Sequence, residues 1–199
     1  EIVKVLDKFE KYATELQAEL QMRYKQYDYY RDMLLSEKYL EKLSEKLECS
    51  INITYTLLED IIKIKNGKDW KKLGKGTVPV YGSGGQMNEF VNQSAYDKPT
   101  VLIPRKGSLN NVFYLDSPFW NVDTVFYTEI NEEKVLPKYF YYFMENFNLS
   151  KLSNESTRPS ITQSSLNKII IPLAPLSIQK QVVKVLDKFQ DYINDTKGL

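Results

Sequence analysis

The sequence has 199 residues, of which 42% are hydrophobic and 27% are charged, a balance that is ordinary for a globular chain. It contains no histidine and one cysteine, which excludes serine–histidine and cysteine–histidine catalytic sites, intrachain disulfides and cysteine-based zinc sites. The net charge of +1 excludes a uniformly basic nucleic-acid binder, although a local basic stretch can still contact phosphate. Without a run of about 18 apolar residues, no membrane span is expected. Neither a catalytic residue, a metal nor a cofactor is expected, and the lone cysteine agrees with a cytoplasmic location.

An internal repeat links the two ends of the chain. Residues 2–9 read Ile-Val-Lys-Val-Leu-Asp-Lys-Phe, and residues 182–189 read Val-Val-Lys-Val-Leu-Asp-Lys-Phe. Seven of these eight positions are identical, and Tyr12 recurs as Tyr192 at the same offset. Long-period repeats of this kind mark a repeated structural unit. We therefore expect a helix followed by a globular domain, in a chain that begins inside one unit and stops inside the next.

The first 48 residues are predicted to form a long amphipathic helix that acts as a spacer. Apolar or aromatic residues recur at alternating steps of four and three, and only Arg23 interrupts this stripe. A sustained 3.5-residue repeat is typical of a coiled-coil seam, and no glycine or proline interrupts residues 1–48. An ordinary core helix is the alternative interpretation. The residues expected to pair, with the second repeat helix or with the same helix of another copy, are Ile2, Leu6, Phe9, Leu16, Leu20, Tyr27 and Leu34.

Residues 49–174 are predicted to form a mixed, β-rich domain. Short apolar segments alternate with Gly, Pro, Asn and Asp, and residues 137–147 return to helical character. Pro172 and Pro175 then break the chain before the start of the second repeat helix, which we place over residues 175–199. The expected fold class is α+β, with this domain held by a long, antiparallel coiled-coil spacer helix.

Two glycine-containing stretches have a composition similar to that of phosphate-binding loops. Gly67 and Gly74 are seven residues apart, and Lys75 is followed by glycine, so the spacing of a P-loop is absent. The turn over residues 81–85 lacks G-x-G-x-x-G spacing, and no βαβ unit surrounds it. A nucleotide site is therefore not expected. The glycines indicate either a tight turn that lets the backbone approach a ligand or a plain loop.

Three polar stretches have the residue types that contact nucleic acid, although each is also compatible with a solvated loop. Residues 63–75 carry six lysines against one acid. Residues 105–111 offer two cations, a glycine and hydrogen-bonding side chains, and residues 154–160 contain one arginine. Together with the glycine-rich turn, they supply the predicted contact residues, which are Lys68, Lys71, Lys72, Lys75, Ser83, Gly84, Arg105, Lys106, Ser108, Asn110 and Arg158.

Several stretches, taken in order, resemble the specificity (S) subunit of type I restriction-modification systems. Residues 57–68 resemble the opening of a target-recognition domain, and residues 78–85 resemble its glycine-rich turn. Residues 101–108 continue the pattern. Residues 160–179 resemble the segment that leads into the family's spacer helix, and residues 27–35 resemble the end of that helix. The resemblance covers nearly the whole chain.

The resemblance implies a subunit with two target-recognition domains joined by two antiparallel helices. Each domain would read one half of a bipartite site in double-stranded DNA. The helices would act as a ruler and dock two methylation subunits, which restriction subunits can join. Because this chain holds one helix, one domain and a helix start, we expect a half-subunit, a fragment or a rearranged version, with pairing to a second copy left open.

Two other functions are alternatives to DNA recognition. Near-neutral charge favours a coiled-coil adaptor with a β-rich protein-interaction domain, whereas the repeat and the glycine-rich turn favour the DNA-reading subunit. The absence of histidine argues against a stand-alone enzyme. The Asn-Pro-Pro-Tyr and Asp-Pro-Pro-Tyr motifs of adenine methyltransferases are also absent, so the chain is not expected to methylate DNA itself.

Overall fold

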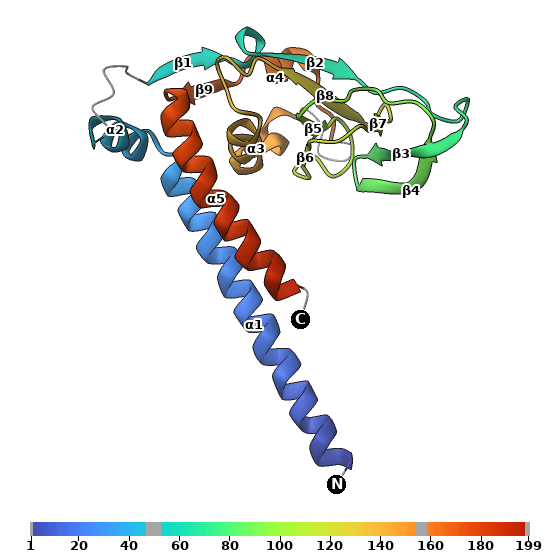
Figure 1. Cartoon of the computed structure of the whole chain (residues 1–199), viewed down its shortest axis with the longest axis vertical. Coiled ribbons are helices and arrows are strands. Elements are labelled where there is room, and N and C mark those ends of the chain that lie inside the picture. The colour runs from blue at the N-terminus through green and yellow to red at the C-terminus, as the bar shows by residue number, and fades with distance from the viewer. Residues whose placement is uncertain (1, 47–52, 154–158, 198–199) are drawn as a thin grey trace.

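The computed structural model describes residues 2–46, 53–153 and 159–197, and it divides into a stalk and a head (Figure 1). The stalk is formed by helices α1 (Ile2–Leu34) and α5 (Leu176–Lys197). The head is formed by the strands and by the short helices between them. The predicted α+β class is therefore confirmed, as is the long N-terminal helix.

The two stalk helices run antiparallel, since α1 ends at the head and α5 begins there (Figure 1). They pack through apolar and aromatic side chains, among which the rings of Tyr30 and Phe189 stack with their centroids 4.9 Å apart. Arg23, which interrupts the apolar stripe of α1, donates a 2.8 Å hydrogen bond from Nη1 to the carbonyl oxygen of Tyr192. The charged residue in the seam therefore binds the partner helix instead of packing against it.

The predicted pairing residues of α1 fall into two groups. Leu20, Tyr27 and Leu34 pack in the hydrophobic core, as a helix seam requires. The others have exposed fractions of 41–78% and have no helix beside them in the described part of the chain: Ile2, Leu6, Phe9 and Leu16. The physical reason is that α5, as described, ends beside the middle of α1 (Figure 1). Among the described residues, α5 closes only the half of the seam near the head.

The expectation of one continuous helix to residue 48 is wrong, because α1 ends at Leu34 and α2 (Glu37–Lys46) starts anew. Neither glycine nor proline causes the break. Instead the Ser36 hydroxyl donates to the carbonyl oxygen of Met33 at 2.6 Å and accepts from the backbone N–H of Tyr39 at 3.4 Å. Such local side-chain bonds compete with helix bonds. Residues 47 and 48, the last of the predicted helix, lie outside the described residues.

The central sheet of the head has four antiparallel strands in the order β2-β8-β5-β6. Their bounds are β2 Ile62–Asn66, β8 Val125–Ile130, β5 Thr100–Pro104 and β6 Phe113–Leu115. Every residue of β5 is buried. The only polar side chain in that strand, Thr100, is satisfied because its hydroxyl donates to the carbonyl oxygen of Thr128 at 2.7 Å. Helix α3 (Pro137–Asn146) matches the predicted helix and packs between this sheet and the stalk.

A second sheet forms the end of the head that is remote from the stalk (Figure 1). Its strands are β3 (Lys75–Gly82), β4 (Gly85–Val91) and β7 (Trp120–Asn121), in the order β4-β3-β7. Strands β3 and β4 form an antiparallel hairpin with two register shifts, and β4 is an edge strand.

A third pair of strands closes the head where the chain enters and leaves it. Strands β1 (Thr54–Leu57) and β9 (Ile170–Leu173) pair antiparallel. The short elements η1 (Leu58–Asp60), η2 (Leu149–Leu152) and α4 (Gln163–Asn167) complete the head. Entry and exit are thus adjacent, so the two stalk helices begin and end at the same place on the head.

Candidate nucleic-acid interface

Two polar stretches that are far apart in the sequence meet at one end of the head. Ser83 and Gly84 form the turn between β3 and β4, and Gly107 lies in the loop after β5. A Cβ atom placed on Gly107 would lie 3.3 Å from Ser83 Oγ, so the two loops are in contact. We call this region, residues 83–84 and 105–111, the recognition tip.

The glycines of the recognition tip have different physical roles. Gly107 has a φ of +79°, in the left-handed region that favours glycine. Gly84 has no atom within 4 Å of the position that a Cβ would take. The fold therefore requires glycine at residue 107 but not at residue 84, where the missing side chain leaves the backbone open to a ligand.

The recognition tip presents several of the predicted contact residues to solvent. Lys106, Ser108 and Asn110 are exposed. Arg105 is half-buried, and its guanidinium carbon lies 5.7 Å from the centre of the Phe126 ring. This cation–π contact holds Arg105 against the head. Lys106 is therefore the freer of the two cations, with hydroxyl and amide groups beside it.

We call the four predicted lysines the lysine cluster. Lys75 begins β3, at the end remote from Ser83, whereas Lys68 lies beside β7, because its backbone N–H donates to the carbonyl oxygen of Asn121 at 2.9 Å. All four are exposed, and the ion pairs found among the described residues involve none of them: Lys68, Lys71, Lys72 and Lys75. Strand β3 separates Lys75 from Ser83, which at about 3.3 Å per residue corresponds to roughly 26 Å. At about 3.4 Å per base pair, one duplex spans this distance in about eight base pairs. Lys75 is thus set apart from the tip by a distance that one duplex can span.

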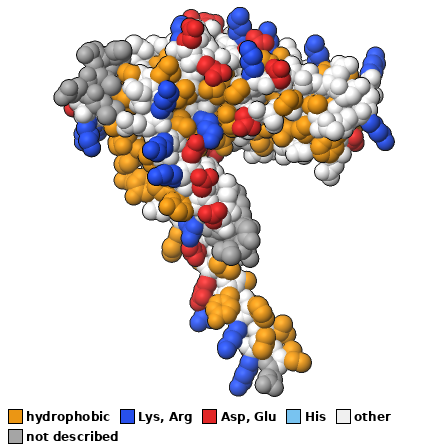
Figure 2. Space-filling model, viewed as in Figure 1, with side chains coloured by type: hydrophobic (Ala, Val, Ile, Leu, Met, Phe, Trp, Pro, Cys, Tyr) orange, Lys and Arg blue, Asp and Glu red, His pale blue; other side chains and the backbone are white. Residues whose placement is uncertain are grey.

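The distribution of charge favours this end of the head over its inner side. Figure 2 shows several Lys and Arg side chains at the end remote from the stalk, where β3 and β4 lie. In contrast, a cleft of about 560 Å³ between head and stalk is lined by residues that include Asp187 and Asp191. Its cation, Lys138, is already paired with Asp187 at 2.7 Å. Phosphate is therefore better accommodated at the remote end. The remaining predicted contact, Arg158, lies outside the described residues.

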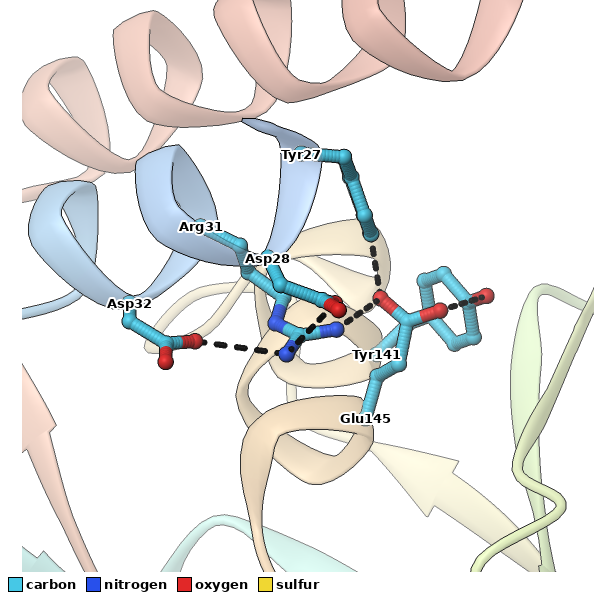
Figure 3. A network of polar contacts seen from close by, with 6 residues as sticks. All are labelled: Tyr27, Asp28, Arg31, Asp32, Tyr141 and Glu145. Atoms are coloured by element: carbon cyan, nitrogen blue, oxygen red, sulfur yellow. Dashed lines mark hydrogen bonds and ion pairs between the residues drawn. The ribbon is translucent and has the colours of Figure 1, made fainter. Parts of the chain in front are cut away.

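A polar network that the sequence analysis did not identify fixes the head to α1 (Figure 3). Glu145 of α3 accepts hydrogen bonds from the hydroxyls of Tyr27 and Tyr141 and pairs with Arg31 at 3.4 Å. Arg31 also pairs with Asp28 at 3.1 Å and with Asp32 at 3.2 Å. We call this set the α1 junction.

Burial and charge act together in the α1 junction. Burial raises the pKa of the Tyr27 phenol well above its ordinary value, and the negative charge of Glu145 raises it further. Burial also lowers the pKa of Arg31, but Glu145 and the other neighbours more than offset this and raise it. The arginine therefore stays charged and the phenol stays neutral at ordinary pH. This combination suits a structural clamp rather than proton transfer.

A second set of contacts, the α5 junction, fixes the head to the other helix. Asp187 accepts hydrogen bonds from the Tyr142 hydroxyl at 2.6 Å and from Lys138 Nζ at 2.7 Å. The side chain of Gln179 is fully buried, and it accepts from the backbone N–H of Leu136 at 2.9 Å. The head is thereby held at both stalk helices.

No helix in the described ranges is long and apolar enough to cross a membrane. The same ranges contain no group of three or more acidic or cysteine side chains placed to hold a metal.

Comparison with known proteins places the chain in a family. Residues 52–198 match the family model described as "Type I restriction modification DNA specificity domain". The specificity subunit of the type I restriction enzyme EcoR124I/EcoR124II of Escherichia coli is 31% identical over all of this chain, which covers 54% of that subunit. A putative type I specificity subunit of Mycoplasma pneumoniae is 26% identical over 98% of this chain and 78% of its own length. Specificity subunits are the non-catalytic components of type I restriction-modification systems.

Solved structures show the same fold. The type I S subunit from M. genitalium superposes with a TM-score of 0.75 and 21% identity, over 98% of this chain and 54% of that one. The HsdS subunit from Thermoanaerobacter tengcongensis gives a TM-score of 0.67 with 12% identity, over 98% and 50%. The chain therefore spans about half the length of these solved subunits. Because the family model covers most of the sequence, the chain belongs to the family of type I restriction-modification DNA specificity domains.

Proposed function

We propose that the head reads one half of a bipartite target in double-stranded DNA. The observation that carries the proposal is the contact between Ser83 and Gly107, which gathers exposed polar side chains and an open backbone at one tip. Side chains of this kind read base edges, whereas lysines contact phosphate and fix the register of the protein on the duplex. The lysine cluster, which precedes and begins β3, would supply the second kind of contact.

The internal repeat supports a second recognition domain at the far end of the stalk. In α5, Val182 and Leu186 are fully buried and Asp187 binds α3. Residues 2–9 of α1 repeat this segment at seven of eight positions and are exposed. A helix segment with the same docking side chains at the same spacing would bind a head of the same kind. The stalk would then be a rod whose length sets the distance between two half-sites.

The stalk would also dock the subunits that carry out the chemistry. The exposed fractions of Met22 and Tyr29 in α1 are 71% and 65%. Large apolar side chains in such positions are typical of protein interfaces. We propose that methylation subunits bind the stalk, that a restriction subunit joins them, and that a second copy of this chain is a further candidate partner. The complex would act on cytoplasmic DNA.

The proposal is tested by selecting tight binders for the full chain from a pool of random duplexes. The expected result is enrichment of one short sequence, with an affinity that falls as salt rises because phosphate contacts release counterions. Binding without any sequence preference would contradict a reading function. Methyl transfer or strand cleavage by the chain alone, free of other subunits, would contradict its role as a non-catalytic component.

A further inference from the structure

Strand β4 carries free amide side chains that none of the contacts above explains. Gln86 and Asn88 are exposed, with the half-buried Met87 between them. The hydrogen bonds of the described residues include neither of their side-chain amides. Residues two apart on a strand lie about 6.6 Å apart on one face, close to the rise of two base pairs.

A third side chain on this strand is exposed although it is apolar. Phe90 has an exposed fraction of 47% and is paired with Pro79 of β3. Gln86 is paired with Tyr81, and the register of the hairpin shifts between these two pairs. Gln86 and Phe90 thus lie at either end of an irregular part of β4, and both side chains are exposed. A large exposed ring beside free amides indicates a binding surface more than a solvated edge.

The hairpin that carries these residues is held rigidly on the head. The ring of Tyr81 packs edge-on against the fully buried Phe119, with centroids 6.4 Å apart. Gly85 has a φ of +109°, and a Cβ placed on it would lie 3.6 Å from the ring of Phe113. Side chains that read a ligand need such a fixed scaffold. A two-stranded antiparallel ribbon also has a width that the major groove of B-DNA admits.

We propose that the β3–β4 hairpin enters the major groove and that Gln86, Asn88 and Phe90 read the bases there. The inference rests on the DNA-reading function proposed above and names the residues that determine specificity. A side-chain amide forms two hydrogen bonds with adenine, at N6 and N7, and an aromatic ring contacts the methyl group of thymine. The half-site read by this head would therefore contain adenine and thymine at positions about two base pairs apart.

The test compares the sequences selected from random duplexes by the full chain and by four variants. Gln86→Ala, Asn88→Ala and Phe90→Ala are each expected to lose the preference at one position. The loss corresponds to a discrimination of about 5- to 150-fold, and the salt dependence stays unchanged because no charge is removed. Gln17→Ala removes an exposed amide from α1 and is the matched control, expected to select the same sequence as the unaltered chain.

A fifth variant guards against an effect of folding. Gln86→Glu keeps the size of the side chain, and a carboxylate accepts a hydrogen bond from cytosine N4. This variant is expected to prefer cytosine at the position where the unaltered chain prefers adenine. A variant that is only less stable would not gain a new preference. If all hairpin variants select the sequence chosen by the unaltered chain, this inference is overturned while the proposed function stands. If the unaltered chain selects no sequence, the proposed function itself fails.

Discussion

The hydroxyl of Tyr142 donates a 2.6 Å hydrogen bond to Asp187 Oδ1, and this bond joins α3 of the head to α5 of the stalk. Lys138 binds the other oxygen of the same carboxylate at 2.7 Å. The α1 junction, built around Glu145, holds the head from the other helix. A head clamped at two helices keeps a fixed angle to the stalk, which is what a ruler between two reading sites requires.

Removing the carboxylate of the α5 junction should loosen the attachment of the head. In Asp187→Ala, the buried Tyr142 hydroxyl loses its acceptor and Lys138 loses its ion pair, so the free energy of unfolding should fall by roughly 1–3 kcal/mol. The measurement is urea-induced unfolding. Asp191→Ala, at an exposed position of the same helix, is the control and should change stability by less than about 0.5 kcal/mol. Equal stability of the two variants would show that the junction does not stabilise the fold.

The tyrosines at the junctions should make the fold sensitive to alkali. Burial raises the pKa of Tyr27, Tyr141 and Tyr142 well above the ordinary value near 10. These phenols stay neutral in the folded chain while they ionise in the unfolded chain. The contribution of these phenols to the free energy of unfolding is therefore fully present below about pH 10. It is lost as the pH rises toward the pKa that they have in the folded chain.

Urea unfolding between pH 8 and pH 11 should accordingly show a falling free energy of unfolding above about pH 10. Tyr142→Phe should show a shallower fall than the unaltered chain, because one shifted phenol is removed. Tyr12→Phe, at an exposed position of α1, should not change the slope. The same slope in Tyr142→Phe and in the unaltered chain would contradict the assignment.

Two glycines that look alike in the sequence should respond in opposite ways to alanine. A Cβ on Gly67 would lie 1.9 Å from the carbonyl oxygen of Val122, so Gly67→Ala should cost about 1–3 kcal/mol of stability. A Cβ on Gly84 meets no atom within 4 Å, so Gly84→Ala should fold normally. If DNA approaches the backbone at the recognition tip, Gly84→Ala should still weaken binding. Thermal unfolding and duplex titration of both variants separate the two effects, and a normally stable Gly67→Ala would show that the backbone there can yield.

Patterns within single elements were sufficient to predict much of the fold. The apolar stripe predicted the helix that is α1, and the helical character of residues 137–147 predicted α3. The break after Leu34 was not predicted, because it depends on the local bonds of Ser36 and on the burial of Leu35 and Leu40 in the core. Those side chains continue a helical pattern in sequence, so periodicity alone could not reveal the break.

The sequence predicted the loops of the recognition tip one by one. It did not predict that these loops come together in the folded head. Nothing in the order of residues indicates that Ser83 and Gly107 touch, because strand pairing across the head brings them together. The junctions had even less signal, since Arg31 and Glu145 lie on different helices far apart in the chain. Within the stalk, by contrast, Arg23 was a visible sign of helix pairing: it is a charged residue on an apolar stripe, and the structure explains it by its bond to α5.

The lysine cluster should contribute affinity without contributing specificity. Replacing Lys71 or Lys72 with alanine should lower the slope of log affinity against log salt by about one for each lysine that binds a phosphate, equally for all duplex sequences. Lys42→Ala in α2 is the matched control, because α2 lies at the opposite end of the head (Figure 1). Titrations at several salt concentrations measure the slope. An unchanged slope in both cluster variants would place the phosphate-binding residues elsewhere.

The stalk should set the spacing between half-sites, which can be tested by changing its length. Seven residues inserted in register after Leu16 of α1, with the matching lengthening of the helix that pairs with this segment, preserve the apolar stripe and add roughly 10 Å to the rod. At about 3.4 Å per base pair, the half-sites should move apart by about three base pairs. The bases read in each half-site should stay the same, because the insertion lies far from the head.

Mapping of the sites methylated by the assembled complex measures both the spacing and the bases read. A single-residue insertion at the same place is the control for register, since it rotates the following residues by about 100° and breaks the seam. It should destabilise the assembly without producing a new spacing, because Leu20, Tyr27 and Leu34 are fixed against α5 and the head while the residues before the insertion turn away from their partner. If the seven-residue insertion leaves the spacing unchanged, or changes the bases that are read, the stalk is not the ruler. The distance between half-sites would then be set by the partner subunits.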